Sequence, residues 1–313
     1  MNFSEMTINE IKKLLKKKKA KEIDEKIIRG LNEDNRKGVN KLARKYERLI
    51  EKKRLIKEKW ISLNRKEEIL RKEGYKFIVG IDEAGRGPLA GPVVAAAVIL
   101  DHDRPIMGLD DSKSLSEKKR EELYDIIKDN SIAVGVGCID NKTIDKINIL
   151  QATFKAMKCA IDDLSEKPDY ILVDGNKEIP GTSIKQEAII DGDCYVNAIA
   201  AASIIAKVYR DRLICKCHSQ YPEYRFDRNK GYGTKEHIEA LKEVGPTPIH
   251  RYSFSIVNKY YFLHFKNNIE QVKTKDELKK LGKNIAENGL FSNENLNILR
   301  KLYKNKYQNI VNE

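Results

Sequence analysis

Apolar residues in the first 75 positions recur at helical spacing. Residues 8–15 place isoleucine and leucine side chains on one face of a predicted helix, and Thr7 and Glu10 have the spacing of a capping box at its start. A second apolar stripe covers residues 39–60, after a polar stretch over 32–38 that is typical of a turn. We therefore expect a pair of helices with lysine-rich outer faces.

From residue 77 the pattern changes to short, continuous apolar runs, which are typical of strands buried on both faces. Strands are predicted over 77–81, 93–100, 132–139, 170–173 and 184–190. Helices are predicted over 142–163, 195–214 and 234–243, and residues 268–313 form a predicted helical tail rich in lysine and asparagine. Strands first, then alternating helices and strands, predict an α/β domain with a mixed sheet.

Charge divides the 313 residues into three parts. The net charge is +13, of which residues 1–75 carry +11, residues 76–258 carry −3 and residues 259–313 carry +5. Basic flanks suit a polyanion, either nucleic acid or an anionic membrane surface, although the lysine run over 16–19 is equally what a solvated helix face would have. We predict a basic nucleic-acid-binding extension over 1–75, a catalytic domain over 76–258 and a basic helical tail over 259–313.

Other features of the chain predict a cytoplasmic location. Its longest uncharged apolar runs are too short to span a bilayer, and its N-terminus lacks a secretory pattern. Five cysteines have no disulfide-like spacing, which favours reduced thiols. We expect a monomer with no membrane partner.

The densest chemical signal follows the first predicted strand. Asp82 and Glu83 stand where that strand stops, and Gly85, Arg86 and Gly87 come directly after. Acidic residues in such turns are commonly no more than solvated. The glycines, however, let backbone N–H groups approach a ligand closely. The segment has the pattern of neither a Walker loop nor a dinucleotide-binding fingerprint.

Two further acidic residues stand at comparable places. Asp174 ends another buried strand, and Asp193 precedes the small-residue helix over 195–214, where it could also act as an N-cap. Acids at strand ends and at a helix start can converge on one pocket of an α/β sheet. Oxygen ligands without histidine or cysteine select a hard cation, Mg²⁺ or Mn²⁺. Two such ions would stabilise the attacking and leaving oxygens of a phosphodiester.

Six segments of this sequence together resemble bacterial ribonuclease HII. They are residues 80–93, 110–113, 149–153, 173–175, 199–207 and 230–237. The resemblance implies a ribonuclease H-like fold, a mixed sheet flanked by helices. It also implies a Mn²⁺- or Mg²⁺-dependent endonuclease that cleaves the RNA strand of RNA–DNA hybrids. Incision 5′ of single ribonucleotides in duplex DNA, with 5′-phosphate and 3′-hydroxyl products, is a further implication.

The resemblance also implies roles for individual residues. The metal-binding carboxylates correspond to Asp82, Glu83, Asp174 and Asp193. The residues that recognise the RNA–DNA junction correspond to Gly85, Arg86 and Gly87. The tyrosine that stacks at the ribonucleotide corresponds to Tyr232. Lys113 and Thr153 correspond to residues that contact phosphates. Asp191 departs from the family pattern, which raises the question whether it contributes to the metal site, but Gly192 and Asp193 fit the motif register and make Asp193 the expected ligand. The sister family, ribonuclease HIII, is less similar because it lacks the Gly-Arg-Gly sequence.

Several alternatives remain open at this stage. Cys215, Cys217 and His218 lack the second half of a zinc site. His237 is expected on a helix surface, and Ser203 has no evident base that would make it a nucleophile. The chain could instead be an inactive nucleic-acid-binding protein, or a related metal nuclease such as a DNA-strand transferase that ignores the 2′-hydroxyl.

Overall fold

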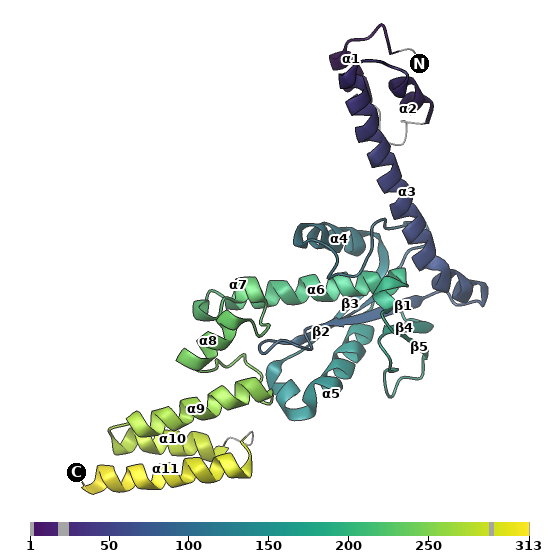
Figure 1. Ribbon diagram of the computed structural model, residues 1–313. Helices are drawn as coiled ribbons and strands as arrows, with labels where there is room; N and C mark the ends of the chain where they lie inside the picture. The colour runs from purple at the N-terminus through teal and green to yellow at the C-terminus, as the bar shows by residue number, and fades with distance from the viewer. Residues whose placement is uncertain (1–2, 18–24, 288–290, 313) are drawn as a thin grey trace. The chain divides into compact units, whose positions relative to one another are not determined.

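The computed structural model describes residues 3–17, 25–287 and 291–312 (Figure 1). The chain forms two compact units, residues 1–65 and residues 66–313. The long helix α3 (Lys37–Lys72) contributes residues to both units. No helix in the described ranges is long and apolar enough to cross a membrane.

The first unit contains α1 (Ile8–Lys17), α2 (Glu25–Asn32) and the beginning of α3. The predicted capping box is present, since the N–H of Thr7 donates to Glu10 at 2.7 Å. The prediction of two helices missed α2, because a helix of eight residues is too short to give a clear periodic pattern of apolar residues. Positions 18 and 19 of the lysine run lie outside the described residues.

A five-stranded mixed sheet forms the centre of the second unit, in the order β3-β2-β1-β4-β5 (Figure 1). The central strand β1 pairs antiparallel with β2 and parallel with β4. Strand β3 pairs antiparallel with β2, and β5 pairs parallel with β4. The strands are β1 (Ile78–Ala84), β2 (Val93–Leu100), β3 (Ser131–Ile139), β4 (Tyr170–Asp174) and β5 (Lys185–Ile189).

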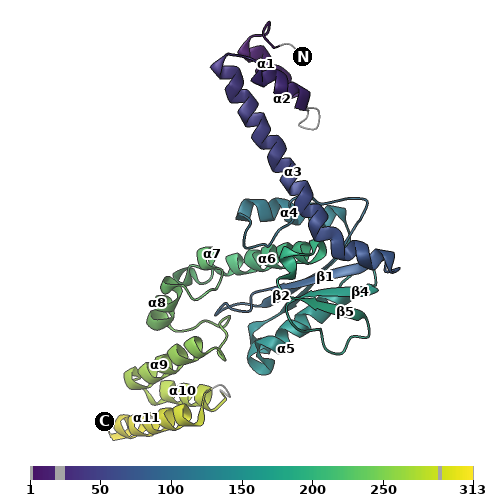
Figure 2. The same ribbon diagram turned by 45° about the vertical axis from the view of Figure 1, so that its right-hand side comes forward.

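Helices cover both faces of this sheet, with α6 (Asn197–Cys217) on one face and α5 (Asn141–Asp162) on the other (Figures 1 and 2). Helix α4 (Glu117–Asn130), which the sequence pattern did not predict, packs on the α6 side. The contact with α6 is close because β1 has a glycine there: a Cβ at Gly80 would lie 2.1 Å from the carbonyl carbon of Ala198. The alanine-rich start of α6 therefore packs directly on the backbone of β1.

The remaining elements follow the sheet in sequence. They are η1 (Gly192–Cys194), η2 (Pro222–Tyr224), α7 (Phe226–Asn229), α8 (Lys235–Val244), α9 (Ser255–Gln271), α10 (Lys275–Glu287) and α11 (Asn293–Asn312). Helix α9 begins four residues before the expected start of the tail at 259, so that boundary falls inside a helix. The mixed sheet with flanking helices, the helical N-terminal extension and the helical tail confirm the predicted architecture.

Candidate active site

A cleft of about 700 Å³ lies at the C-terminal end of β1. Ser112, Arg120 and Lys207, which were not predicted as site residues, line this cleft. Nine of the ten predicted site residues also line it: Asp82, Glu83, Gly85, Arg86, Gly87, Lys113, Asp174, Asp193 and Tyr232. The fold thus brings residues from five separate segments of the sequence to one place.

Sheet register explains why Asp82 and Asp174 converge. Strands β1 and β4 are parallel, with Ile81 opposite Val173, and each aspartate is the next residue along its strand. Both side chains therefore fall on the face that α6 covers. Asp82 is 5 % exposed, and its Oδ1 accepts the N–H of Glu83 at 2.6 Å.

Asp193 reaches the same cleft from η1, the short turn before α6. The Oδ1 of Asp174 accepts the N–H of Gly192 at 2.7 Å, and this bond holds the end of β4 against the turn. Asp193 is buried at 7 % exposure and lines the cleft, whereas Asp191 is exposed and does not line it. Asp191 has a left-handed backbone conformation, with φ of 53°. This geometry favours Asp193 over Asp191 as a ligand.

Burial, and to a lesser extent neighbouring carboxylates, raises the pKa of the acidic residues in the cleft. Burial, then the charges of Glu83 and Asp174, raises the pKa of Asp82 well above its usual value. Burial, followed by the charge of Asp174, raises the pKa of Asp193 to about 6. The pKa of Glu83 and that of Asp174 are also raised, mainly by burial. Four carboxylates are thus held close together in a partly buried cleft, where ionisation is unfavourable without a nearby cation.

Two of the cationic side chains that line the cleft interact with these carboxylates. Arg86 forms an ion pair with Glu83, with 3.1 Å between Nη1 and Oε1. Burial opposes the charge on Lys113, but nearby carboxylates, among them Asp111 and Asp193, outweigh burial and raise its pKa. Lys113 is consequently a protonated, exposed ammonium group at the edge of the acidic cluster.

The donor set fits a hard divalent cation. Asp82, Glu83, Asp174 and Asp193 offer only oxygen atoms, which are the ligands of Mg²⁺ and Mn²⁺. Among the described residues, no three acidic, histidine or cysteine side chains form by themselves a group that could hold a metal ion. Mg²⁺ is commonly held by one or two carboxylates together with substrate phosphates, and an acidic cleft with open space suits that mode.

The loop after β1 lies close to Tyr232 across the cleft. A Cβ at Gly87 would lie 3.7 Å from Cε1 of Tyr232. The Tyr232 side chain is 41 % exposed, and Nζ of Lys207 lies 5.6 Å from its ring centroid. Gly85 has φ of +96°, and a Cβ there would collide with the side chain of Arg210. Glycine is therefore required at position 85 for the loop to take this shape.

Two fully buried arginines support this loop, and the sequence pattern did not reveal them. Arg251 donates to the carbonyl oxygens of Gly85 and Arg86, at 2.5 and 2.9 Å. Arg210 donates to the carbonyl of Lys230, two residues before Tyr232, at 2.9 Å. Each guanidinium also donates to the carbonyl of Pro92 at 3.0 Å. The two arginines thus connect the Gly-Arg-Gly loop with the Tyr232 loop.

A pair of buried histidines holds the Tyr232 loop from behind. Nδ1 of His237 lies 2.9 Å from the carbonyl oxygen of Tyr232 and must donate to it. The two Nε2 atoms of His237 and His250 are 2.9 Å apart, and Nδ1 of His250 accepts the N–H of Thr247 at 2.9 Å. His250 therefore carries its proton on Nε2 and donates to His237. The expectation that His237 lies on a helix surface was wrong, because its side chain is fully buried.

Both histidine rings are neutral in this arrangement. Burial lowers the pKa of His237, and burial together with the neighbouring His237 lowers the pKa of His250 to about 3. Rings of Tyr224 and Phe226 surround the pair, with centroid distances of 4.9 Å from Tyr224 to His250 and 5.4 Å from Phe226 to His237. The pair is a fixed hydrogen-bonded support for the Tyr232 loop.

Helix α3 also supports the cleft, through Glu67. Helix α6 has no side-chain cap of its own at Val196, and Oε1 of Glu67 instead accepts the N–H of Ala198 at 3.0 Å. Glu67 is 1 % exposed and pairs with Arg71 at 3.3 Å. Burial raises its pKa to about 7 even though Arg71 and the Ala198 N–H act to lower it. The start of α6, next to Asp193, is therefore held by the end of α3.

Other residues singled out in the sequence lie outside the cleft or are engaged in hydrogen bonds of their own. Thr153 is buried in α5, and its hydroxyl donates to the carbonyl of Ile149 at 2.9 Å, so the structure does not bring it into the cleft. The Ser203 hydroxyl lines the cleft but donates to the hydroxyl of Ser112 at 2.8 Å. All five cysteines are free thiols, and Cys215 accepts from Nζ of Lys230 at 2.9 Å.

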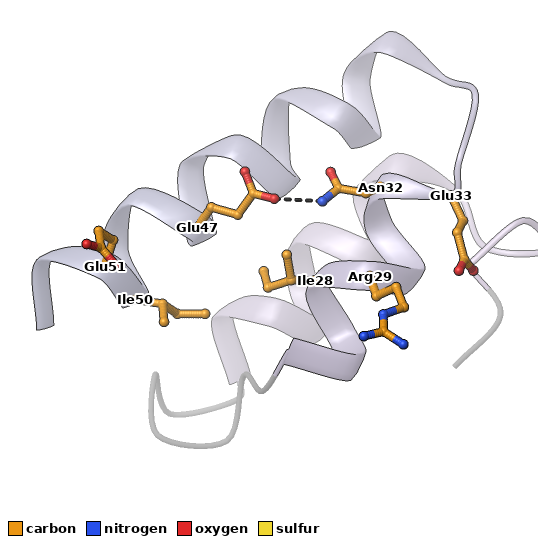
Figure 3. Close-up of a pocket in the computed structure, with 7 residues that line it drawn as sticks. All are labelled: Ile28, Arg29, Asn32, Glu33, Glu47, Ile50 and Glu51. Atoms are coloured by element: carbon orange, nitrogen blue, oxygen red, sulfur yellow. Dashed lines mark hydrogen bonds between the residues drawn. The ribbon is translucent and has the colours of Figure 1, made fainter. Parts of the chain in front are cut away.

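A second hollow of about 550 Å³ lies within the first unit, between α2 and α3 (Figure 3). Ile28 and Ile50 face it from the two helices, and Nδ2 of Asn32 donates to Glu47 at 2.6 Å. It is lined by none of the predicted site residues. The hollow gives no indication of chemistry comparable to the acidic cleft.

Comparison with known proteins agrees with the site. The family model for ribonuclease HII matches residues 79–257, and that for the ribonuclease HII N-terminal domain matches residues 7–71. Ribonuclease HII of Bacillus subtilis is 45 % identical over 255 residues, which are 82 % of this chain and 98 % of that protein. Ribonuclease HII of Lactobacillus delbrueckii is 50 % identical over 254 residues, covering 81 % of this chain and 97 % of that one.

Among solved structures, the chain is similar to ribonuclease H2 from Pyrococcus horikoshii. The TM-score is 0.50 and the identity 29 %, over 59 % of this chain and 97 % of that one. This likeness confirms the expected ribonuclease H-like fold. With a family model matched across the acidic cleft and relatives covered almost end to end, the chain belongs to the ribonuclease HII family.

Proposed function

We propose that this enzyme is a metal-dependent endonuclease that hydrolyses the RNA strand of RNA–DNA hybrids and incises duplex DNA 5′ of single ribonucleotides. The products would carry 5′-phosphate and 3′-hydroxyl ends. Membership of the ribonuclease HII family supports the activity on hybrids. The single observation that carries the metal dependence is the convergence of four carboxylates with raised pKa in one cleft.

In this proposal Asp82, Glu83, Asp174 and Asp193 hold divalent cations, either Mn²⁺ or Mg²⁺. When bound, two such ions would supply the positive charge that stabilises the attacking and leaving oxygens of the phosphodiester. The mutual repulsion of the carboxylates supports this role, since it is relieved when cations enter the cleft. Lys113 would contact a phosphate next to the one that is cleaved, because it stays protonated beside the cluster.

Recognition of the ribonucleotide would depend on the 2′-hydroxyl, which alone distinguishes RNA from DNA at any base sequence. The backbone of Gly85, Arg86 and Gly87 could contact that hydroxyl, because glycine exposes its N–H and carbonyl groups. The Tyr232 ring faces Gly87 across the cleft and could pack against the next deoxyribose. The loop that binds the 2′-hydroxyl is continuous with β1, so recognition and placement of Asp82 and Glu83 would be linked.

The test is a nicking assay on three duplexes that share one sequence: an RNA–DNA hybrid, a DNA duplex with one ribonucleotide, and DNA alone. We expect cleavage of the first two with Mn²⁺ or Mg²⁺, none of the third, and none of any with a chelator. Cleavage of the all-DNA duplex would favour a strand transferase. Binding without cleavage in the presence of either metal would favour an inactive binding protein.

Tyr232 gives a sharper test of junction recognition. Tyr232→Ala should lose most activity on the single ribonucleotide while the fold stays intact, because the ring no longer packs on the sugar. Tyr232→Phe should lose less if packing dominates, and as much if the hydroxyl bonds a phosphate. Wild-type cleavage by Tyr232→Ala would refute the role of this residue and leave the metal-dependent activity unaffected.

We also infer that the basic residues of 1–75 add affinity for the same substrates, and that the enzyme acts as a monomer in the cytoplasm. The charge of +11 on this segment supports the first inference. Free cysteines in the described structure suit a reducing compartment. Sedimentation analysis with and without a hybrid duplex would test the monomeric state.

A further inference from the structure

Helices α9, α10 and α11 pack around a core of their own at the C-terminal end of the chain (Figure 1). Leu278 of α10 and Leu299 of α11 are fully buried in it, and Phe291 stacks on Tyr261 with 5.2 Å between ring centroids. Nζ of Lys306 donates to the carbonyl of Glu270 at 2.9 Å, which joins α11 to the end of α9. Residues 258–313 lie beyond both ranges matched by the family models, so the family assigns this bundle no role.

A groove of about 420 Å³ lies between α10 and α11. Its centre is the contact between Gly282 and Tyr303, where a Cβ on the glycine would lie 2.7 Å from Cε2 of the tyrosine. The ring can lie across α10 only because residue 282 has no side chain. The phenol is therefore half-buried in the floor of the groove.

Positive charge surrounds this floor. Lys279 and Lys283 of α10 and Arg300 and Lys304 of α11 line the groove, and all four are exposed. No carboxylate is among the described residues that line it. The like charges of Lys279, Arg300 and Lys304 around one groove repel one another, and an anion bound there would relieve that repulsion.

We propose that the α10–α11 groove binds the phosphate backbone of a nucleic-acid duplex, as a contact additional to the acidic cleft. Cations on two adjacent helices would contact successive phosphates, and the edge of Tyr303 would pack on the sugar between them. A nucleic acid suits this groove better than a membrane surface does. Membrane-bound helices present a broad apolar face beside their charges, whereas the apolar Ile285 of this groove is buried.

Two charge-matched double variants of the full chain test the proposal. The first, Lys279→Gln with Lys304→Gln, removes two cations that line the groove. The second, Lys280→Gln with Lys301→Gln, removes two exposed cations from the same helices that do not line it. Binding to an all-DNA duplex is measured by fluorescence anisotropy over a range of salt concentrations. No cleavage enters this measurement, so its outcome is independent of the proposed nuclease activity.

We expect the groove variant to bind the duplex more weakly, with the slope of log affinity against log salt reduced in magnitude by about two. The control variant should keep the wild-type affinity and slope. Equal losses of affinity in both variants would show that only net charge matters and would overturn the proposal. Unchanged affinity in both variants would also overturn it. A groove variant that loses binding only to phosphatidylserine-containing vesicles would also overturn it, in favour of a membrane surface. Circular dichroism on heating should show both variants folded.

Discussion

The Nη2 atom of Arg251 donates to the carbonyl oxygen of Gly85 at 2.5 Å, across 166 positions of sequence. The guanidinium is fully buried, and its hydrogen-bond partners are backbone carbonyls, which include those of Arg86, Gly91 and Pro92. Burial lowers the pKa of Arg251 to about 9, so the side chain keeps its charge at neutral pH. One side chain thereby fixes the backbone that we propose contacts the 2′-hydroxyl.

Arg251→Lys should destabilise the protein and reduce cleavage, although the charge is kept. A single ammonium group cannot reproduce the planar fork of the guanidinium, and each buried carbonyl left without a donor costs about 1–3 kcal/mol. We expect a loss of roughly 2–4 kcal/mol in the free energy of unfolding by urea. Arg104→Lys, a change at an exposed arginine, is the control and should have no effect. Equal stability of the two variants would show that the carbonyl contacts are unimportant.

Asp193→Asn and Asp191→Asn together decide which aspartate is the ligand. Of the two, only Asp193 lines the cleft. The cleavage rate of Asp193→Asn should therefore fall about 1000-fold or more, because several kcal/mol of metal-assisted stabilisation of the transition state are lost. Asp191→Asn should stay near the wild-type rate. Affinity for the hybrid should persist in both, because phosphate binding depends on basic residues. An inactive Asp191→Asn with an active Asp193→Asn would reverse the assignment.

Asp193→Asn should also stabilise the metal-free protein in a pH-dependent way. A carboxyl whose pKa rises from 3.8 to about 6 on folding favours the folded state below pH 4, and that contribution is lost as the pH rises through 6. The free energy of unfolding of the variant should therefore exceed that of the wild type at pH 7, with a difference that vanishes near pH 4. Urea unfolding in a chelator at several pH values measures this. A difference independent of pH would mean that the ionisation of Asp193 is not its cause.

His250→Leu should impair cleavage through the Tyr232 loop. The change leaves the Nε2 of His237 and the N–H of Thr247 buried without partners, at about 1–3 kcal/mol each. Phe226→Leu removes volume from the same core without touching these hydrogen bonds. We compare the two variants relative to their loss of stability. For the same loss, His250→Leu should reduce cleavage of the duplex with a single ribonucleotide far more than Phe226→Leu does. Equal activities would mean that the pair only fills the core.

Deletion of residues 1–65 should weaken hybrid binding and leave the maximal cleavage rate little changed. The segment carries much of the positive charge but none of the residues that line the cleft. The salt slope should fall by about 0.9 for each phosphate that this segment neutralises in the full chain. The deletion must stop before Glu67, whose carboxylate caps α6. Unchanged affinity and slope would leave this segment without a role in substrate binding.

The sequence predicted an acidic cleft because the carboxylates lie directly at the ends of apolar runs. A buried strand that stops at Asp82 or at Asp174 places a carboxylate at a sheet edge, whatever the rest of the chain does. Parallel pairing of β1 with β4 then brings the two edges together. Local pattern and a general rule of α/β topology therefore placed these two acids at one sheet edge, while their predicted role as metal ligands came from the resemblance to ribonuclease HII.

The supporting residues could not be predicted in the same way. Arg210 and Arg251 are polar residues that local pattern assigns to the surface, and they are buried only because distant carbonyls surround them. His237 has a partner 13 positions away, and nothing in the periodicity of α8 reveals that partner. Thr153 was predicted to contact phosphate because of a family motif, but its hydroxyl donates a hydrogen bond within its own helix. Contacts between distant segments decide where the two arginines and the histidine lie.

The contact between Glu67 and Ala198 has a consequence for the order in which the enzyme is assembled. A ribosome releases Glu67 long before Ala198, which is 131 residues later in the chain. Until then the carboxylate of Glu67 stays in water, and the docking site for the end of α3 does not yet exist. Closing so long a loop is slow compared with forming a helix, so the capping of α6 belongs to the late steps of folding. The turn that carries Asp193 can thus take its final position only after the chain has been made as far as α6.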